Sequence, residues 1–128
     1  AARRAATRRD ADDVRRLEEL LDARGERPQD GDLAGFIERD IAFHVAVAQS
    51  GGNAALVELY RYFALALHGS TSAALADRTL PEPDLAAHRR VVDAIRDRDE
   101  AGAAEAARAI VSPILDALER DGPAAADR

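Results

Sequence analysis

The sequence contains no cysteine, and aromatic residues make up only 4% of its 128 residues. The absence of cysteine excludes disulfide bonds, cysteine-based metal sites and thiol catalysis. No apolar stretch is long enough to span a membrane, and no signal peptide is recognisable. The net charge of −6 argues against a surface that grips a phosphate backbone. The one basic cluster lies at the extreme N-terminus without an aromatic residue, and we interpret it as a solvated helix end.

The residues that are abundant favour helices. Hydrophobic residues reach 47%, and alanine dominates them, while no alternating run rich in Val, Ile or Thr indicates a strand. Charged residues of both signs make up 33% and are interleaved, as on solvated helix faces. The sequence therefore predicts a single all-α domain over residues 1–128. We expect an antiparallel bundle of about six helices, packed through Leu, Val, Ile and Ala.

Turn and capping signals divide the chain into these helices. Residues 1–9 are expected to be the end of a first helix whose beginning is absent. The second helix is expected to end near Ala23, the third to span residues 33–50, and the fourth to run from Asn53 towards His68. The fifth is expected to begin near Asp84, and the last to follow a turn over residues 98–102. The expected N-caps are Asp10 or Asp12, Asp32 and Asn53, and Asp84 is expected to lie near the start of its helix. A proline-containing loop around residues 78–83 separates the two halves, and Pro113 is expected to kink the last helix.

The segment that spans residues 33–50 carries the first candidate functional residues. At helical period, Asp40 and His44 share a stripe with Leu33, Ile37 and Val47, which is expected to be buried. Burying an ionised aspartate costs several kcal/mol unless it is paired or binds a metal. Two interpretations remain open at this point. The residues form a hydrogen-bonded pair inside a helical core, or they belong to a ligand or metal site.

A second histidine strengthens the functional interpretation. His88 lies on an apolar stripe with Leu85, Val92 and Ile95, so it too is expected to face inward. Asp40, His44 and His88 together can supply one oxygen and two nitrogen donors, a set that suits zinc, nickel or manganese. Open coordination positions would take water or a small anionic ligand. The third histidine, His68, precedes a glycine at an expected helix end and is interpreted as a surface or capping residue.

Two motifs in register resemble a known family. These are Asp40-Ile-Ala-Phe-His44, followed by Ala48-Gln-Ser-Gly-Gly-Asn53, and the later segment Ala-His-Arg-Arg-Val-Val-Asp-Ala-Ile-Arg-Asp-Arg-Asp over residues 87–99. The sequence is similar to the ligand-binding domain of GntR-type bacterial transcription regulators, the FadR C-terminal domain or FCD class. The resemblance covers roughly residues 10–120.

The resemblance implies a helical bundle around an effector pocket, often with a bound divalent metal. The family's metal ligands are an aspartate, the histidine four residues on, a histidine that opens a later helix, and a further histidine on the last helix. The first three map to Asp40, His44 and His88. The fourth position holds Ile110, which makes that wall apolar and favours a different effector, although three protein ligands can still hold zinc. The doubled glycine before Asn53 is a smaller departure.

The resemblance also implies partners and a location. Such a regulator is a cytoplasmic homodimer that binds a small-molecule effector, here expected to be a carboxylate. It contacts DNA only through an N-terminal winged helix-turn-helix domain, which is absent from this chain. The effector pocket is expected to contain Asp40, His44, His88 and Ile110, with Tyr60 and Arg61 as further candidate contacts.

Two alternatives belong to other functional classes. An open-sided His-His-Asp site can activate water, so a small metal-dependent hydrolase or isomerase is the first alternative. Against it, Glu38 points away from the Asp40 stripe and Glu58 falls on another helix, which leaves no evident additional acid or base. The second alternative is a structural dimerisation module with a hydrogen-bonded polar core.

Overall fold

The computed structural model describes residues 1–69 and 83–121, apart from the side chains of residues 63, 66–69, 118 and 121. Over these residues the chain forms six helices and no strand, which confirms the expected all-α fold. The helices are α1 (Ala2–Arg8), α2 (Ala11–Arg24), α3 (Leu33–Ser50), α4 (Ala54–Gly69), α5 (Leu85–Arg96) and α6 (Glu100–Asp121). Most of the expected loop around residues 78–83, the side chain of His68 and the expected polar tail lie outside the described residues.

Side-chain caps begin α2, α3, α4 and α5, and those of α2, α3 and α4 lie at predicted residues. In each case the carboxylate or amide oxygen accepts a hydrogen bond from the backbone N–H three residues on. The capping residues are Asp10 at 2.7 Å, Asp32 at 2.8 Å, Asn53 at 3.1 Å and Asp84 at 2.8 Å. Asp10 is the cap rather than Asp12, because the Asp13 carboxylate accepts a bond from the Asp10 backbone N–H and so completes a capping box.

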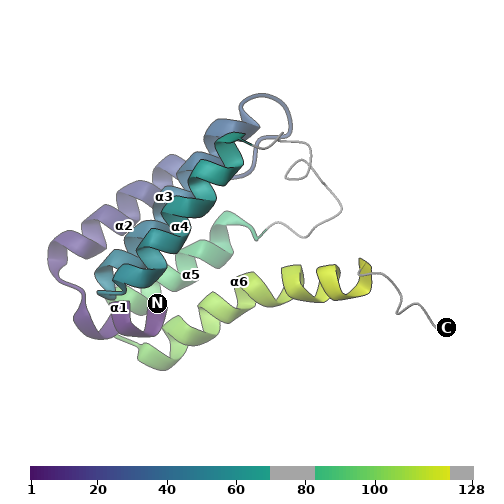
Figure 1. Cartoon of the computed structure of the whole chain (residues 1–128). Coiled ribbons are helices and arrows are strands. Elements are labelled where there is room, and N and C mark those ends of the chain that lie inside the picture. The colour runs from purple at the N-terminus through teal and green to yellow at the C-terminus, as the bar shows by residue number, and fades with distance from the viewer. Residues whose placement is uncertain (70–82, 122–128) are drawn as a thin grey trace.

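The last helix begins earlier than predicted. The expected turn over residues 98–102 ends at Asp99, because the Asp99 carboxylate accepts a bond of 2.9 Å from the Gly102 backbone N–H and so caps α6. Gly102 therefore lies inside the helix. Pro113 also lies within α6, which continues to Asp121. Figure 1 shows the ribbon of α6 changing direction partway along its length, as expected for a helix that contains a proline.

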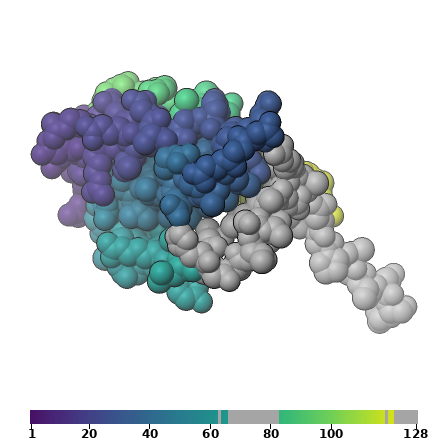
Figure 2. Space-filling model, turned by 90° about the horizontal axis from the view of Figure 1, so that it is seen from above, coloured from purple at the N-terminus to yellow at the C-terminus, as the bar shows by residue number. Residues whose placement is uncertain are grey.

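The helices pack in pairs that place α3 near the centre of the fold. α3 contacts α2, α4 and α1, while α5 contacts α6, α2 and α1 (Figure 1). α4 packs against α3 alone among the described helices. In the space-filling view, side chains of α2, α3 and α4 form one continuous face (Figure 2). This arrangement brings the inner sides of α3 and α5 towards each other.

The core contains many alanines, as the composition predicted. Fully buried examples are Ala5, Ala6, Ala48 and Ala103. Such small side chains let helix axes approach closely. One close approach lies at Gly51, just after α3, where an added Cβ would lie 3.0 Å from the Ala1 carbonyl oxygen. A side chain at the first glycine of the Gly-Gly pair would therefore be crowded by the backbone of residues 1–5.

The buried face of α3 differs from the predicted stripe. Phe36, Phe43 and Val47 are its most buried large side chains, whereas Leu33 and Ile37 are half-buried. The difference arises because α3 packs between α2 and α4, which buries a wider face than a single stripe. Asp40 and His44 therefore lie beside the core, with side chains 27% and 24% exposed.

Candidate metal centre

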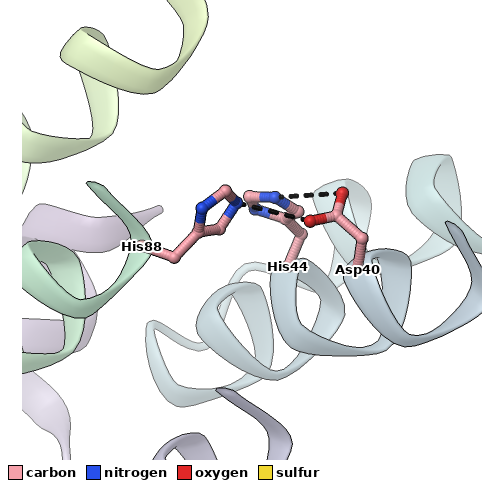
Figure 3. Close-up of side chains that lie close together, drawn as sticks. All are labelled: Asp40, His44 and His88. Atoms are coloured by element: carbon pink, nitrogen blue, oxygen red, sulfur yellow. Dashed lines mark ion pairs between the residues drawn. The ribbon is translucent and has the colours of Figure 1, made fainter. Parts of the chain in front are cut away.

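Three side chains that the sequence grouped as metal ligands lie together in the fold. Asp40 and His44 project from α3, and His88 projects towards them from α5 (Figure 3). One potential ligand atom from each lies within 4.8 Å of the others. The His44 Nε2 atom lies 3.6 Å from Asp40 Oδ2, and the His88 Nε2 atom lies 3.3 Å from Asp40 Oδ1.

The start of α5 orients His88. Asp84 caps this helix through its carboxylate, and its backbone carbonyl oxygen accepts a hydrogen bond of 2.8 Å from the His88 ring. A carbonyl can only accept, so Nδ1 carries the proton and donates. The neutral ring then has its lone pair on Nε2, the atom that faces Asp40. A hydrogen bond from the ring nitrogen that does not face the metal is the usual way in which proteins orient a metal-binding histidine.

The contact between His88 and Asp40 is one that a positive charge between the two side chains would stabilise. A neutral His88 would present a lone pair to a carboxylate oxygen 3.3 Å away, and the two acceptors would repel each other. A proton on His88 Nε2 relieves this repulsion, and so does a divalent cation held between the donors. The geometry therefore fits a cation-binding group.

Arg24, at the end of α2, is part of this group and was missed in the sequence analysis. Its side chain is only 1% exposed, and its Nε atom donates to Asp40 Oδ1 at 2.5 Å. Its terminal nitrogens donate to the backbone carbonyls of Gly25, at 2.8 Å, and Pro83, at 3.1 Å. The guanidinium also lies 4.8 Å from the ring centre of Phe36, within cation–π range. Arg24 thus joins α2, α3 and the residue before the cap of α5.

A local signal for Arg24 does exist in the sequence. Leu17, Leu21 and Arg24 are spaced four and three residues apart and are the buried residues of α2. An arginine that continues an apolar stripe is expected to need a buried anionic partner. Asp40, as a largely buried carboxylate, is likewise expected to need a cationic partner. Arg24 and Asp40 supply these partners to each other.

The charges of the cluster shift its acid–base properties. Burial alone raises the pKa of Asp40, but hydrogen bonds from His88 and Arg24 and the nearby charges of His44 and Arg24 hold its pKa well below its usual range. Burial lowers the pKa of His44, with the charges of His88 and Arg24 adding to this effect and Asp40 opposing it. Asp40 is therefore ionised and His44 neutral at pH 7, the forms in which both bind metals.

Aromatic rings enclose His44. The Tyr60 ring stacks on it with ring centres 5.9 Å apart and planes 12° apart. Phe43 and His88 meet its ring edge-to-face at 5.3 Å each. Burial, followed by the charge of Asp40, raises the pKa of Tyr60, so its hydroxyl is neutral at pH 7. His44 is thereby held in one orientation beside Asp40.

A small cavity adjoins the cluster. Its volume is about 90 Å³, and its lining includes Phe43, His44, Val47, Tyr60, Val91 and Ile110. His44 is the cluster residue that reaches it, since Asp40 and His88 do not belong to the lining. Two of the predicted effector contacts, Tyr60 and Ile110, thus share a cavity with His44.

Arg61 does not join this group. It is exposed and pairs with Glu58 on the same helix at 2.5 Å. It borders a separate surface hollow with Gln49 and Asn53. The difference between Tyr60 and Arg61 follows from their neighbouring positions on α4, because consecutive helical residues point about 100° apart.

The donor set fits a divalent ion. Zinc binds nitrogen and oxygen ligands at about 2.0–2.2 Å, so tetrahedral neighbours lie about 3.4 Å apart. The three donor atoms here, within 4.8 Å of one another, can reach that separation by small side-chain rotations. One aspartate and two histidines leave at least one coordination position for water or a ligand.

Residues 1–113 match the family model of the FCD domain, a segment that contains Asp40, His44, His88 and Ile110. No curated protein and no solved structure showed a significant match. Over residues 1–69 and 83–121, none of the helices combines the length and apolar character needed to cross a membrane.

Proposed function

Because the chain belongs to the FCD family, the effector-binding domain of GntR-type transcription regulators, we propose that it senses a small organic acid at Asp40, His44 and His88 together with a divalent metal ion. The observation that supports the proposal best is the convergence of these three side chains from two helices. Zinc, nickel and manganese are the candidate ions. A bound ion would supply positive charge to which the acid's carboxylate is attracted.

The enzyme alternative has no support. The FCD family is a non-enzymatic family of regulator domains. Glu58, one of the acids considered in the sequence analysis, is exposed on α4 and pairs with Arg61. The open position of the cluster therefore has a role in binding rather than in activating water.

The proposed output is a change in DNA affinity. A GntR-type regulator binds DNA through a winged helix-turn-helix domain, and it acts in the cytoplasm. An effector that binds one arrangement of a dimer more tightly shifts the population of the DNA-binding arrangement by that difference in affinity. The contribution of the present domain is the effector site and the contact between subunits.

Binding of metal and acid to the purified chain tests this function. Zinc, nickel or manganese is expected to raise the melting temperature, and a saturating carboxylate to raise it further. Saturation at 100 times the Kd stabilises by about 2.7 kcal/mol, which corresponds to about 8–10 °C for a domain of this size. Calorimetric titration gives the two affinities, and EDTA should reverse both effects. Absence of metal uptake, or no response to any member of a panel of organic acids, would contradict the proposal.

The dimer that the family implies has a candidate surface on α4. Leu59, Tyr62 and Leu65 lie three residues apart, and Tyr62 and Leu65 are 67% and 73% exposed. Large apolar side chains at such spacing on one helix face indicate a surface that another protein covers. We propose that a second copy of the chain covers it, since homodimers with the same patch on both subunits are the commonest oligomers.

Self-association should therefore depend on Leu65. L65E places a charge on the proposed interface and is expected to weaken dimerisation at least tenfold, measured by sedimentation over a concentration series. L115E is the matched control, because Leu115 is a similarly exposed leucine on α6. An L65E protein that remains dimeric while L115E dissociates would place the interface on α6 instead.

A further inference from the structure

We infer that the effector is a small monocarboxylic acid with a short apolar chain, which lies in the cavity beside His44. The inference rests on the proposed function, because it names the class of acid for that same site. It excludes dicarboxylic acids and long acyl chains. Three observations support it. They are the volume of the cavity, the apolar chemistry of its wall, and the hydrogen bonds that already occupy Arg24, the buried arginine nearby.

The volume of the cavity indicates a small ligand. The cavity holds about 90 Å³, whereas pockets for drug-sized ligands enclose about 300–1,000 Å³. An acid of about two to four carbons is of the size that so small a cavity favours.

Aliphatic side chains form much of the remaining cavity wall. Val47, Val91 and Ile110 come from α3, α5 and α6, so each of these helices contributes an aliphatic side chain to the same cavity. Among the described residues, the polar side chains of the lining are His44 and Tyr60, and Ala1 also borders the cavity. A ligand with one polar and one apolar end matches this division. Its carboxylate belongs beside His44, and its alkyl end belongs against Ile110 and the two valines.

No arginine side chain lines the cavity among the described residues. Arg24, the buried arginine of the cluster, already donates to Asp40 and to the carbonyls of Gly25 and Pro83. Arg61 is paired with Glu58 on an exposed surface. A second carboxylate in the ligand would therefore meet hydrocarbon side chains without a cationic side chain to pair with, which is unfavourable.

Ile110 is the residue that decides this preference. The family pattern places a histidine at this position, whereas the present chain has a β-branched alkyl side chain that is buried in the cavity wall. An imidazole there would offer a polar contact for a second functional group of the ligand. Isoleucine instead offers a surface for methyl and methylene groups.

A matched pair of acids tests the inference on the unmodified chain. Butyrate and succinate have the same number of carbons, and succinate replaces the terminal methyl group by a carboxylate. The chain is loaded with zinc and titrated calorimetrically with acetate, propionate, butyrate, hexanoate and succinate. Butyrate or propionate is expected to bind at least about tenfold more tightly than succinate, and hexanoate is expected to bind more weakly than butyrate.

A cavity-enlarging variant provides the second test. I110A should shift the preferred chain length upwards, so that the hexanoate-to-butyrate affinity ratio rises by about tenfold. L115A is the control, since Leu115 lies on the same helix but outside the cavity lining, and its ratio should not change. If I110A does not fold, the comparison of acids on the unmodified chain decides alone.

The outcomes separate this inference from the proposed function. Succinate binding as tightly as butyrate, or hexanoate binding best, would overturn the short-chain preference and leave a metal-and-acid sensor in place. Binding of metal without binding of any acid would overturn both. The predicted order of affinities, together with the shift in I110A alone, would establish the apolar subsite.

Discussion

Replacing Arg24 by methionine is expected to lower the free energy of unfolding of the metal-free chain by about 3–5 kcal/mol, the usual effect of removing one partner of a buried ion pair. The variant leaves Asp40 beside the core without its closest cation. It also leaves the Gly25 and Pro83 carbonyls without the guanidinium donors that they now have. Methionine retains much of the apolar volume, so the loss reports the polar contacts rather than a cavity.

Urea denaturation measures this effect, and α2 offers a matched control. Arg15 also pairs with an aspartate, Asp12, at 2.7 Å, but both side chains are exposed. R15M should therefore change stability by no more than about 0.5 kcal/mol. An R24M variant as stable as R15M would show that the buried pair contributes little net stability.

Metal affinity gives R24M a second readout that a purely structural role would not change. Arg24 shares the Asp40 carboxylate with any bound ion, and two cations on one carboxylate repel each other. Removing the guanidinium should strengthen zinc binding, and zinc should then restore part of the lost stability. A folded R24M protein with weaker zinc binding would instead identify Arg24 as a support for the orientation of Asp40.

Loss of His88 is expected to abolish metal binding. With Asp40 and His44 alone, the site would have two protein ligands, fewer than the three found in open zinc sites. Metal content of the purified protein, measured by mass spectrometry, should fall from near one ion per chain to about a tenth or less in H88A and H44A. I110H should have the opposite effect, because it supplies the imidazole that the family pattern has on the last helix.

Controls are needed because exposed acidic groups also bind divalent ions weakly. H68A removes the remaining histidine and should leave the metal content unchanged. The fold of each variant is checked by circular dichroism, so that loss of metal is not confused with loss of structure. Full metal content in a folded H88A protein would contradict the three-residue site.

The parts of the fold that could be predicted from the sequence are those determined by nearby residues. A cap depends on a side chain and the N–H three residues later, so Asp32 and Asn53 were placed correctly. Asp40 and His44 share a face because they are one helical turn apart. The apolar stripe of the later helix then brought His88 into the same group, and the structure places it there.

Features that depend on how helices meet could not be predicted in this way. The contact between Arg24 and Asp40 depends on the angle at which α2 turns back along α3, which no local pattern specifies. The same holds for the wide buried face of α3, where Phe43 rather than Leu33 lies in the core. On α4, the sequence did not separate Tyr60, which stacks on His44, from Arg61, which faces away.

The alanine-rich interior makes the fold more sensitive to substitutions that enlarge a side chain than to those that shorten one. Ala5, Ala6, Ala48 and Ala103 have no exposed surface, and little can be removed from side chains that are already this small. Adding even one or two methyl groups at such a position forces packed helices apart and costs about 1–3 kcal/mol. Mutational drift in this domain is therefore limited mainly by enlargement of its smallest residues, in contrast to cores built from leucine and phenylalanine, where truncation is the common damage.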